Sequence, residues 1–170
     1  AQMASNEQGI LLFGNAVTLR DFTLTSPNRT SSTGSAYGIK TGPSTIPANC
    51  TNLVVTNVKV DNIKKSGFDF NTTLGGTFTN LVASNISGGY GVSIAGAASN
   101  LSFTGVTITA CAWGDVGVFP WPASSANRPS GIQFNNGGAG LNFNTINVQP
   151  YTTTIAVSTT FLASPLYNAA

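Results

Sequence analysis

Short apolar segments that begin at a glycine recur along this chain, and each is followed by a second apolar segment. The five glycine-opened segments are residues 9–13, 38–41, 67–70, 91–94 and 131–134. The segments that follow them are residues 17–24, 53–60, 81–86, 101–108 and 141–148. A repeat of about 20 to 40 residues with one internal pattern is typical of a solenoid, in which each repeat buries its apolar face against its neighbours.

Apolar residues alternate with polar ones within these segments, which is the two-residue period of a half-buried β-strand. No stretch keeps the 3.6-residue period of an amphipathic helix. Aligning the second segments at their first apolar residue predicts one buried column: Val17, Leu53, Leu81, Leu101 and Leu141. The same alignment predicts that Phe103 stacks directly on Phe143.

The alternation slips by one residue inside each second segment. The slips occur at Asp21, Asn57, Asn85, Gly105 and Thr145. A slip of one residue turns every later side chain to the opposite face, so a single flat strand cannot carry the pattern. Asn, Asp and Gly tolerate the left-handed or bridge conformations that turn a strand through a corner. We therefore expect three short strands per coil, with Asn57 and Asn85 as buried neighbours in a corner ladder.

Three short strands per coil with an asparagine corner resemble the right-handed parallel β-helix of the pectate-lyase-like superfold, over about residues 9–158. In its low charge, asparagine corners and irregular loops, the chain is most similar to β-helix segments of phage tailspikes and tail fibres. The resemblance implies an all-β, right-handed parallel β-helix of about five to six coils, the sixth beginning at residues 154–158. We expect residues 1–170 to form a single β-helix domain that is a fragment or subunit of a larger assembly.

Composition agrees with a solenoid and argues against several partners. Charged residues make up 7% of the 170 residues, histidine is absent, and the formal net charge is +2. The basic residues are scattered except for Lys64 and Lys65, so we expect no nucleic-acid binding. No apolar run approaches the ~20 residues of a membrane span. Cys50 and Cys111 occupy different places in the repeat, which favours two free, buried thiols over a disulfide.

The acidic residues form no familiar catalytic or metal-binding pattern. They are Glu7, Asp21, Asp61, Asp69 and Asp115. Glycoside hydrolysis commonly uses two facing carboxylates, and calcium binds several oxygen ligands. The Gly-His-Gly and Arg-x-Lys patterns of polygalacturonase-like sites and the Asp clusters of pectate-lyase-like sites are missing. Asp69 is expected to make a surface ion pair with Lys40 of the preceding coil. We therefore expect no catalytic residue, no metal and no cofactor.

One long segment, residues 109–130, interrupts the repeat and holds both tryptophans. We expect it to be a loop insertion, and insertions in a solenoid usually emerge on one face, often the binding face. Its aromatic and polar side chains suit a sugar ring, which predicts these ligand-binding residues: Trp113, Asp115, Phe119, Trp121 and Arg128. The alternative is that the two tryptophans cover an apolar face of the coils or pack against another subunit.

Three functions remain open from the sequence. The first is an extracellular or virion-surface adhesion module of the tailspike or tail-fibre type, which forms a homo-oligomer such as a trimer and binds cell-surface polysaccharide. The second is a self-assembling extracellular filament subunit whose coils stack end to end. The third is a polysaccharide lyase or hydrolase, which a sequence without histidine and with few carboxylates disfavours.

Overall fold

The computed structural model describes residues 9–26, 37–42, 50–120, 129–135, 141–143, 146–148 and 167–169. Within these ranges the chain forms strands in two sheets, and no helix occurs that is long and apolar enough to cross a membrane. The seven-stranded sheet contains β1 (Ile10–Leu12), β3 (Ile39–Thr41), β5 (Phe68–Asn71), β7 (Val92–Ala95), β9 (Val116–Phe119), β11 (Ile146–Val148) and β12 (Tyr167–Ala169). The five-stranded sheet contains β2 (Thr18–Thr25), β4 (Cys50–Ile63), β6 (Thr73–Ile86), β8 (Ser99–Cys111) and β10 (Ser130–Asn135).

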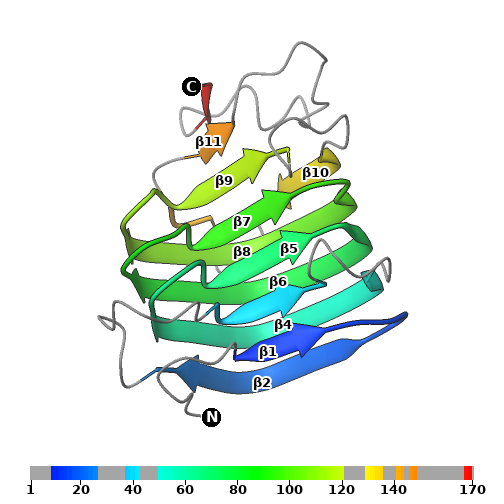
Figure 1. Cartoon of the computed structure of the whole chain (residues 1–170), viewed down its shortest axis with the longest axis horizontal. Coiled ribbons are helices and arrows are strands. Elements are labelled where there is room, and N and C mark those ends of the chain that lie inside the picture. The colour runs from blue at the N-terminus through cyan, green and yellow to red at the C-terminus, as the bar shows by residue number, and fades with distance from the viewer. Residues whose placement is uncertain are drawn as a thin grey trace.

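The chain crosses repeatedly from one sheet to the other, and all strand pairs within each sheet are parallel. Figure 1 shows the result as a right-handed stack of coils, with β1 and β2 at one end and β11 near the other. The expected parallel β-solenoid is confirmed. The described residues complete about four turns rather than five to six coils. The sixth coil expected at residues 154–158 lies outside the described residues.

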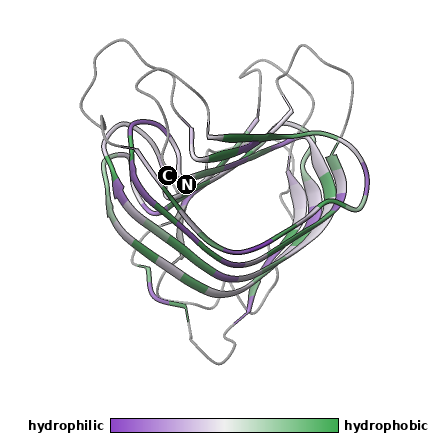
Figure 2. Cartoon of the chain, turned by 90° about the horizontal axis from the view of Figure 1, so that it is seen from below, coloured by the Kyte–Doolittle hydropathy of each residue, from purple (hydrophilic) through white to green (hydrophobic). Residues whose placement is uncertain are grey.

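The coils superpose along the solenoid axis, and apolar residues alternate with polar ones along them (Figure 2). Inside, Phe78, Phe103 and Phe134 occupy paired positions of β6, β8 and β10. Their ring centroids are 4.5 Å apart for the first pair and 4.7 Å apart for the second, and both pairs are stacked. Phe70 reaches Phe78 from the opposite sheet, with 4.3 Å between ring centroids. This aromatic stack joins the two sheets into one buried core.

The long strands of the five-stranded sheet turn corners at every fifth residue. The residues with positive φ are Asn52, Asn57 and Asn62 in β4, Gly75, Asn80 and Asn85 in β6, and Asn100, Gly105 and Ala110 in β8. One left-handed residue bends the strand, which is the role that the sequence predicted for asparagine and glycine. The amides bond along the stack, because Asn80 Nδ2 donates to Asn57 Oδ1 at 3.0 Å and Asn57 Nδ2 donates to Asp21 Oδ1 at 2.9 Å.

The register of β6 differs from the expected one by five residues. Asn57 lies beside Asn80 and not beside Asn85, and all three side chains are exposed rather than buried. Leu81 pairs with Val58 instead of joining the column of Leu53. The reason is that each long strand has three equivalent corners, so aligning the wrong pair of corners preserves the alternation of inward and outward side chains.

The last coils also differ from the sequence alignment. Phe134, and not Phe143, stacks on Phe103, because Asn142 pairs with Thr107 and so places Phe143 five residues further along the coil. Residues 131–134, expected to be a glycine-opened strand, belong to β10 in the five-stranded sheet.

The segment 109–130, expected to be one loop insertion, is partly regular. It includes the end of β8 and all of β9, which pairs with β7 in the seven-stranded sheet. Asp115 stands where the preceding coil has Gly91, as the hydrogen bond from the Val92 amide to the Asp115 carbonyl shows. The glycine that precedes β1, β3, β5 and β7 is therefore missing before β9, which concealed this strand in the sequence.

The corner conformation predicts a contrast between two substitutions of Asn57. Asn57→Val places a β-branched side chain at a φ of 53° and should lower the free energy of unfolding by about 1–2 kcal/mol or more. Asn57→Gly keeps the corner conformation, so it should cost less, although both variants lose the same amide bonds. Thr56→Val, in the adjoining extended position, serves as the control and should be nearly neutral. Equal losses for Val and Gly in urea denaturation would contradict the left-handed corner.

Candidate functional site

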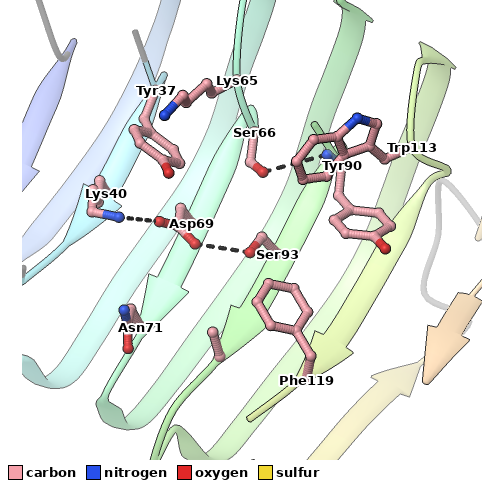
Figure 3. Close-up of a pocket in the computed structure, with 11 residues that line it drawn as sticks. Tyr37, Lys40, Lys65, Ser66, Asp69, Asn71, Tyr90, Ser93, Trp113 and Phe119 are labelled. Atoms are coloured by element: carbon pink, nitrogen blue, oxygen red, sulfur yellow. Dashed lines mark hydrogen bonds and ion pairs between the residues drawn. The ribbon is translucent and has the colours of Figure 1, made fainter. Parts of the chain in front are cut away.

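A groove of about 380 Å³ lies on the outer face of the seven-stranded sheet (Figure 3). Its position follows from the strand alternation, because Phe68 and Phe70 of β5 point into the core and turn Asp69 and Asn71 outward. The residues that line the groove are Tyr37, Lys40, Lys65, Ser66, Asp69, Asn71, Tyr90, Ser93, Ala95, Trp113 and Phe119.

The parallel register arranges most of these side chains in three rows that cross the strands. The central row is Lys40, Asp69 and Ser93, at paired positions of β3, β5 and β7. One edge row is Asn71, Ala95 and Phe119, at paired positions of β5, β7 and β9. The opposite edge row is Tyr37, Ser66 and Tyr90, whose carbonyl oxygens accept hydrogen bonds from successive coils just before the strands begin.

The central row is a partly buried polar network. Lys40 Nζ makes an ion pair with Asp69 Oδ2, and Ser93 Oγ donates to Asp69 Oδ1 at 2.8 Å. The expected pairing is confirmed, but it is not a surface ion pair, since the Lys40 and Asp69 side chains are only 13% and 7% exposed. Lys40 Nζ also lies 4.0 Å from the centroid of the Tyr37 ring, which covers it.

Tyr37 supplies a hydroxyl at the edge of this network. Burial, followed by the negative charge of Asp69, raises the pKa of Tyr37 above its ordinary value of 10.0. The phenol therefore stays protonated at neutral and mildly alkaline pH and remains able to donate a hydrogen bond. Lys65 Nζ lies 5.3 Å from the same ring centroid, so a second cation flanks Tyr37.

Aromatic rings form the other wall of the groove. The centroid of the Tyr90 ring lies 5.9 Å from that of Trp113, edge to face, and 6.0 Å from that of Phe119. Tyr90 rests on β9 because residue 117 is glycine: a Cβ there would stand 2.5 Å from the Tyr90 ring. Trp113 is 62% exposed, so much of its surface remains open to a ligand.

Asn71 presents an acceptor without a partner. Its backbone is held by Thr41: the Asn71 amide donates to Thr41 Oγ1 at 2.8 Å, and the Asn71 carbonyl accepts from the same hydroxyl at 2.9 Å. Its side-chain Oδ1 is buried and has no hydrogen-bond partner within the described part of the chain. Leaving a buried acceptor unsatisfied costs about 1–3 kcal/mol, which a ligand that donates a hydrogen bond would recover.

The predicted ligand-binding residues fall in three places. Trp113 and Phe119 both line the groove. Asp115 is 9% exposed and is not among the lining residues. Trp121 and Arg128 lie outside the described residues. The remaining lining residues were not predicted as ligand contacts. Five of them stand at outward positions that follow an opening glycine, which could have indicated them: Lys40, Asp69, Asn71, Ser93 and Ala95. The other four precede an opening glycine and carried no such signal: Tyr37, Lys65, Ser66 and Tyr90.

The two cysteines are free thiols, as expected. Cys50 is buried, whereas Cys111 at the end of β8 is only half-buried. Burial, with the nearby charge of Asp115 as a second cause, raises the pKa of Cys111 to about 12. No group of three or more His, Cys, Asp or Glu side chains within the described ranges is placed to hold a metal ion.

Comparisons with protein-family models, with curated proteins and with solved structures find no match to this chain. What the structure shares with the pectate-lyase-like superfold is the architecture of a parallel β-solenoid.

The burial of the Lys40–Asp69 pair predicts that it contributes far more to stability than an exposed pair. Lys40→Met keeps most of the side-chain volume but leaves the Asp69 carboxylate without its cation, so we expect the free energy of unfolding to fall by about 3 kcal/mol. Arg20→Met is the matched control, because the Arg20 and Asp21 side chains are 75% and 57% exposed, and it should cost less than about 1 kcal/mol. Similar losses in urea denaturation of the two variants would contradict a buried pair.

Proposed function

We propose that this chain is the saccharide-binding solenoid of an extracellular or virion-surface adhesion protein, of the tailspike or tail-fibre type. Its binding site would be the groove on the outer face of the seven-stranded sheet. The observation that carries the proposal is that one groove holds the exposed ring of Trp113, the partly exposed ring of Tyr90 and the unsatisfied buried acceptor of Asn71.

Sugars present both kinds of surface that this groove complements. The C–H face of a pyranose ring is apolar and packs on aromatic rings, while its hydroxyl groups donate and accept hydrogen bonds at the ring edge. Trp113 supplies the aromatic surface, Asn71 an acceptor, and Lys65 a donor on the opposite side of the groove. A concave site with an apolar wall and a few fixed polar groups is the usual form of a ligand site.

The solenoid also holds the groove ready for a ligand. The strands that carry it are fixed by ladder hydrogen bonds to both neighbours, so few side chains have to be ordered on binding. From β3 to β9 the groove crosses three inter-strand spacings, about 14 Å. An oligosaccharide, rather than a single sugar, would fill that span.

Hydrolysis is less well supported than binding. Among the described residues that line the groove, Asp69 is the one carboxylate, and it is already engaged by Lys40 and Ser93. Glycoside hydrolysis commonly uses two carboxyl groups across the scissile bond, about 5–10 Å apart. A groove whose one carboxylate is already bound by a lysine and a serine is better suited to binding a glycan than to cleaving it.

A filament subunit is the second candidate, and one observation favours it. Within the described residues, β1 pairs only with β3 and β2 pairs only with β4, so the first coil presents a strand edge on each sheet. Unpaired edges are templates for pairing with another chain. Open-ended growth in light scattering would favour the filament, whereas a discrete trimer would favour the adhesion module.

The adhesion proposal predicts that Trp113→Ala weakens saccharide binding without unfolding the protein. On an oligosaccharide array followed by calorimetry, we expect the affinity for the best ligand to fall about tenfold, equivalent to about 1.4 kcal/mol of aromatic contact. The melting temperature should change little because Trp113 is 62% exposed. Val54→Ala, at an exposed apolar position of the five-stranded sheet, is the control and should bind like the parent protein. The proposal fails if the parent protein binds no saccharide, or if Trp113→Ala binds as tightly as the parent.

A further inference from the structure

The edge row of Asn71, Ala95 and Phe119 combines three groups that suit one chemical substituent. The paired positions of β5, β7 and β9 place an amide, a methyl group and an aromatic ring side by side, about 4.8 Å apart from strand to strand. Figure 3 shows Asn71 and Phe119 at one end of the groove, away from Lys65 and Trp113 at the other. Among the described residues of this edge row, Asn71 is the one with a polar side chain.

The unsatisfied atom sets the first requirement on a ligand. Asn71 is 5% exposed, and its Oδ1 can only accept. The backbone amide and carbonyl of Asn71 both form hydrogen bonds with the Thr41 hydroxyl, which fixes the position of the residue. Its side-chain oxygen has no hydrogen-bond donor among the described residues. A ligand group at this end must bring an N–H or O–H to that oxygen.

The neighbours of Asn71 set the second requirement. Phe119 is partly exposed and Ala95 is only 2% exposed; both line this end of the groove, and neither carries a side-chain hydrogen-bonding group. A sugar hydroxyl could donate to Asn71, but its own lone pairs would face this apolar surface, and a polar group buried without partners is costly. An acetamido group satisfies both requirements, because its N–H donates to Asn71 Oδ1 while its methyl group packs against Ala95 and Phe119.

We infer that this end of the groove is an acetamido subsite, so the glycan that the groove recognises carries an N-acetylhexosamine. This inference rests on the proposed saccharide-binding function and names its ligand class. The sugar ring that bears the acetamido group lies over the central row, towards Tyr90 and Trp113. Asn71 is then a specificity-determining residue, since a sugar without the amide leaves its buried oxygen unpaired.

The test compares oligosaccharides that differ only in the group at C2. Tetrasaccharides of N-acetylglucosamine and of N-acetylgalactosamine are each paired with the hexose parent of the same linkage, and binding is measured by calorimetry. We expect at least one acetylated member to bind ten times more tightly than its parent. Equal or tighter binding of the parents would overturn the acetamido subsite but leave the proposed function intact. Absence of binding by every saccharide on a broad array would overturn both.

Two variants separate recognition of the acetamido group from general saccharide binding. Asn71→Ala removes an acceptor that has no partner, so the melting temperature should hold while the affinity for the acetylated ligand falls to that of its parent. Ala95→Val adds bulk where the acetyl methyl packs and should cause the same selective loss. Val54→Ala should leave both affinities unchanged. The subsite is wrong if either groove variant weakens the acetylated and parent sugars equally.

Saturation-transfer NMR on the parent protein gives a direct readout of the contact. The acetyl methyl protons should receive the strongest saturation of any ligand protons, and Asn71→Ala should abolish that preference. Strong saturation of the ring protons with none at the methyl would contradict the subsite. An acetyl-lysine peptide that binds as tightly as the sugars would assign the amide recognition to a different class of ligand and overturn the inference.

Discussion

Parallel, in-register stacking of the coils is the constraint on which the rest of this structure depends. Each long strand of the five-stranded sheet turns at a left-handed residue every five positions, and the turns of successive coils lie over one another. That alignment places Phe78 on Phe103 inside the solenoid and Asn80 on Asn57 outside it. A slip between two coils would separate both stacks at once, so the core and the corners specify the same register.

The same constraint builds the groove. Because the seven-stranded sheet is also in register, the outward residue of one strand always meets the outward residue of the next, and side chains from distant parts of the sequence form rows. Lys40 and Asp69 are 29 residues apart and yet form a largely buried ion pair. Asn71 departs from the otherwise consistent design, because its side-chain oxygen is buried without a partner. Local departures of this kind are expected at functional sites.

The sequence predicted the architecture well and the register poorly, for a physical reason. Alternation of apolar and polar residues reports which face a side chain occupies, and that was sufficient to predict a parallel solenoid. It does not distinguish equivalent corners, so Asn85 was aligned with Asn57 in place of Asn80. The sequence predicts Trp113 as a ligand contact because both tryptophans fall in the segment that interrupts the repeat. Asn71 cannot be told apart from other polar residues on a strand by sequence, because only the structure shows that its side chain is buried and its oxygen has no partner among the described residues.

Disulfide trapping of coil neighbours tests the register most directly. In a background with Cys50 and Cys111 replaced by alanine, Thr56→Cys with Thr79→Cys places two thiols at paired positions of β4 and β6, about 4.8 Å apart at Cα and within reach of a disulfide. Thr56→Cys with Ser84→Cys represents the alternative alignment and should exceed the span of about 7 Å that a disulfide allows. We predict rapid oxidation of the first pair and none of the second, measured as a loss of free thiols in the folded protein. Selective closure of the second pair would contradict the register, and with it the rows that form the groove.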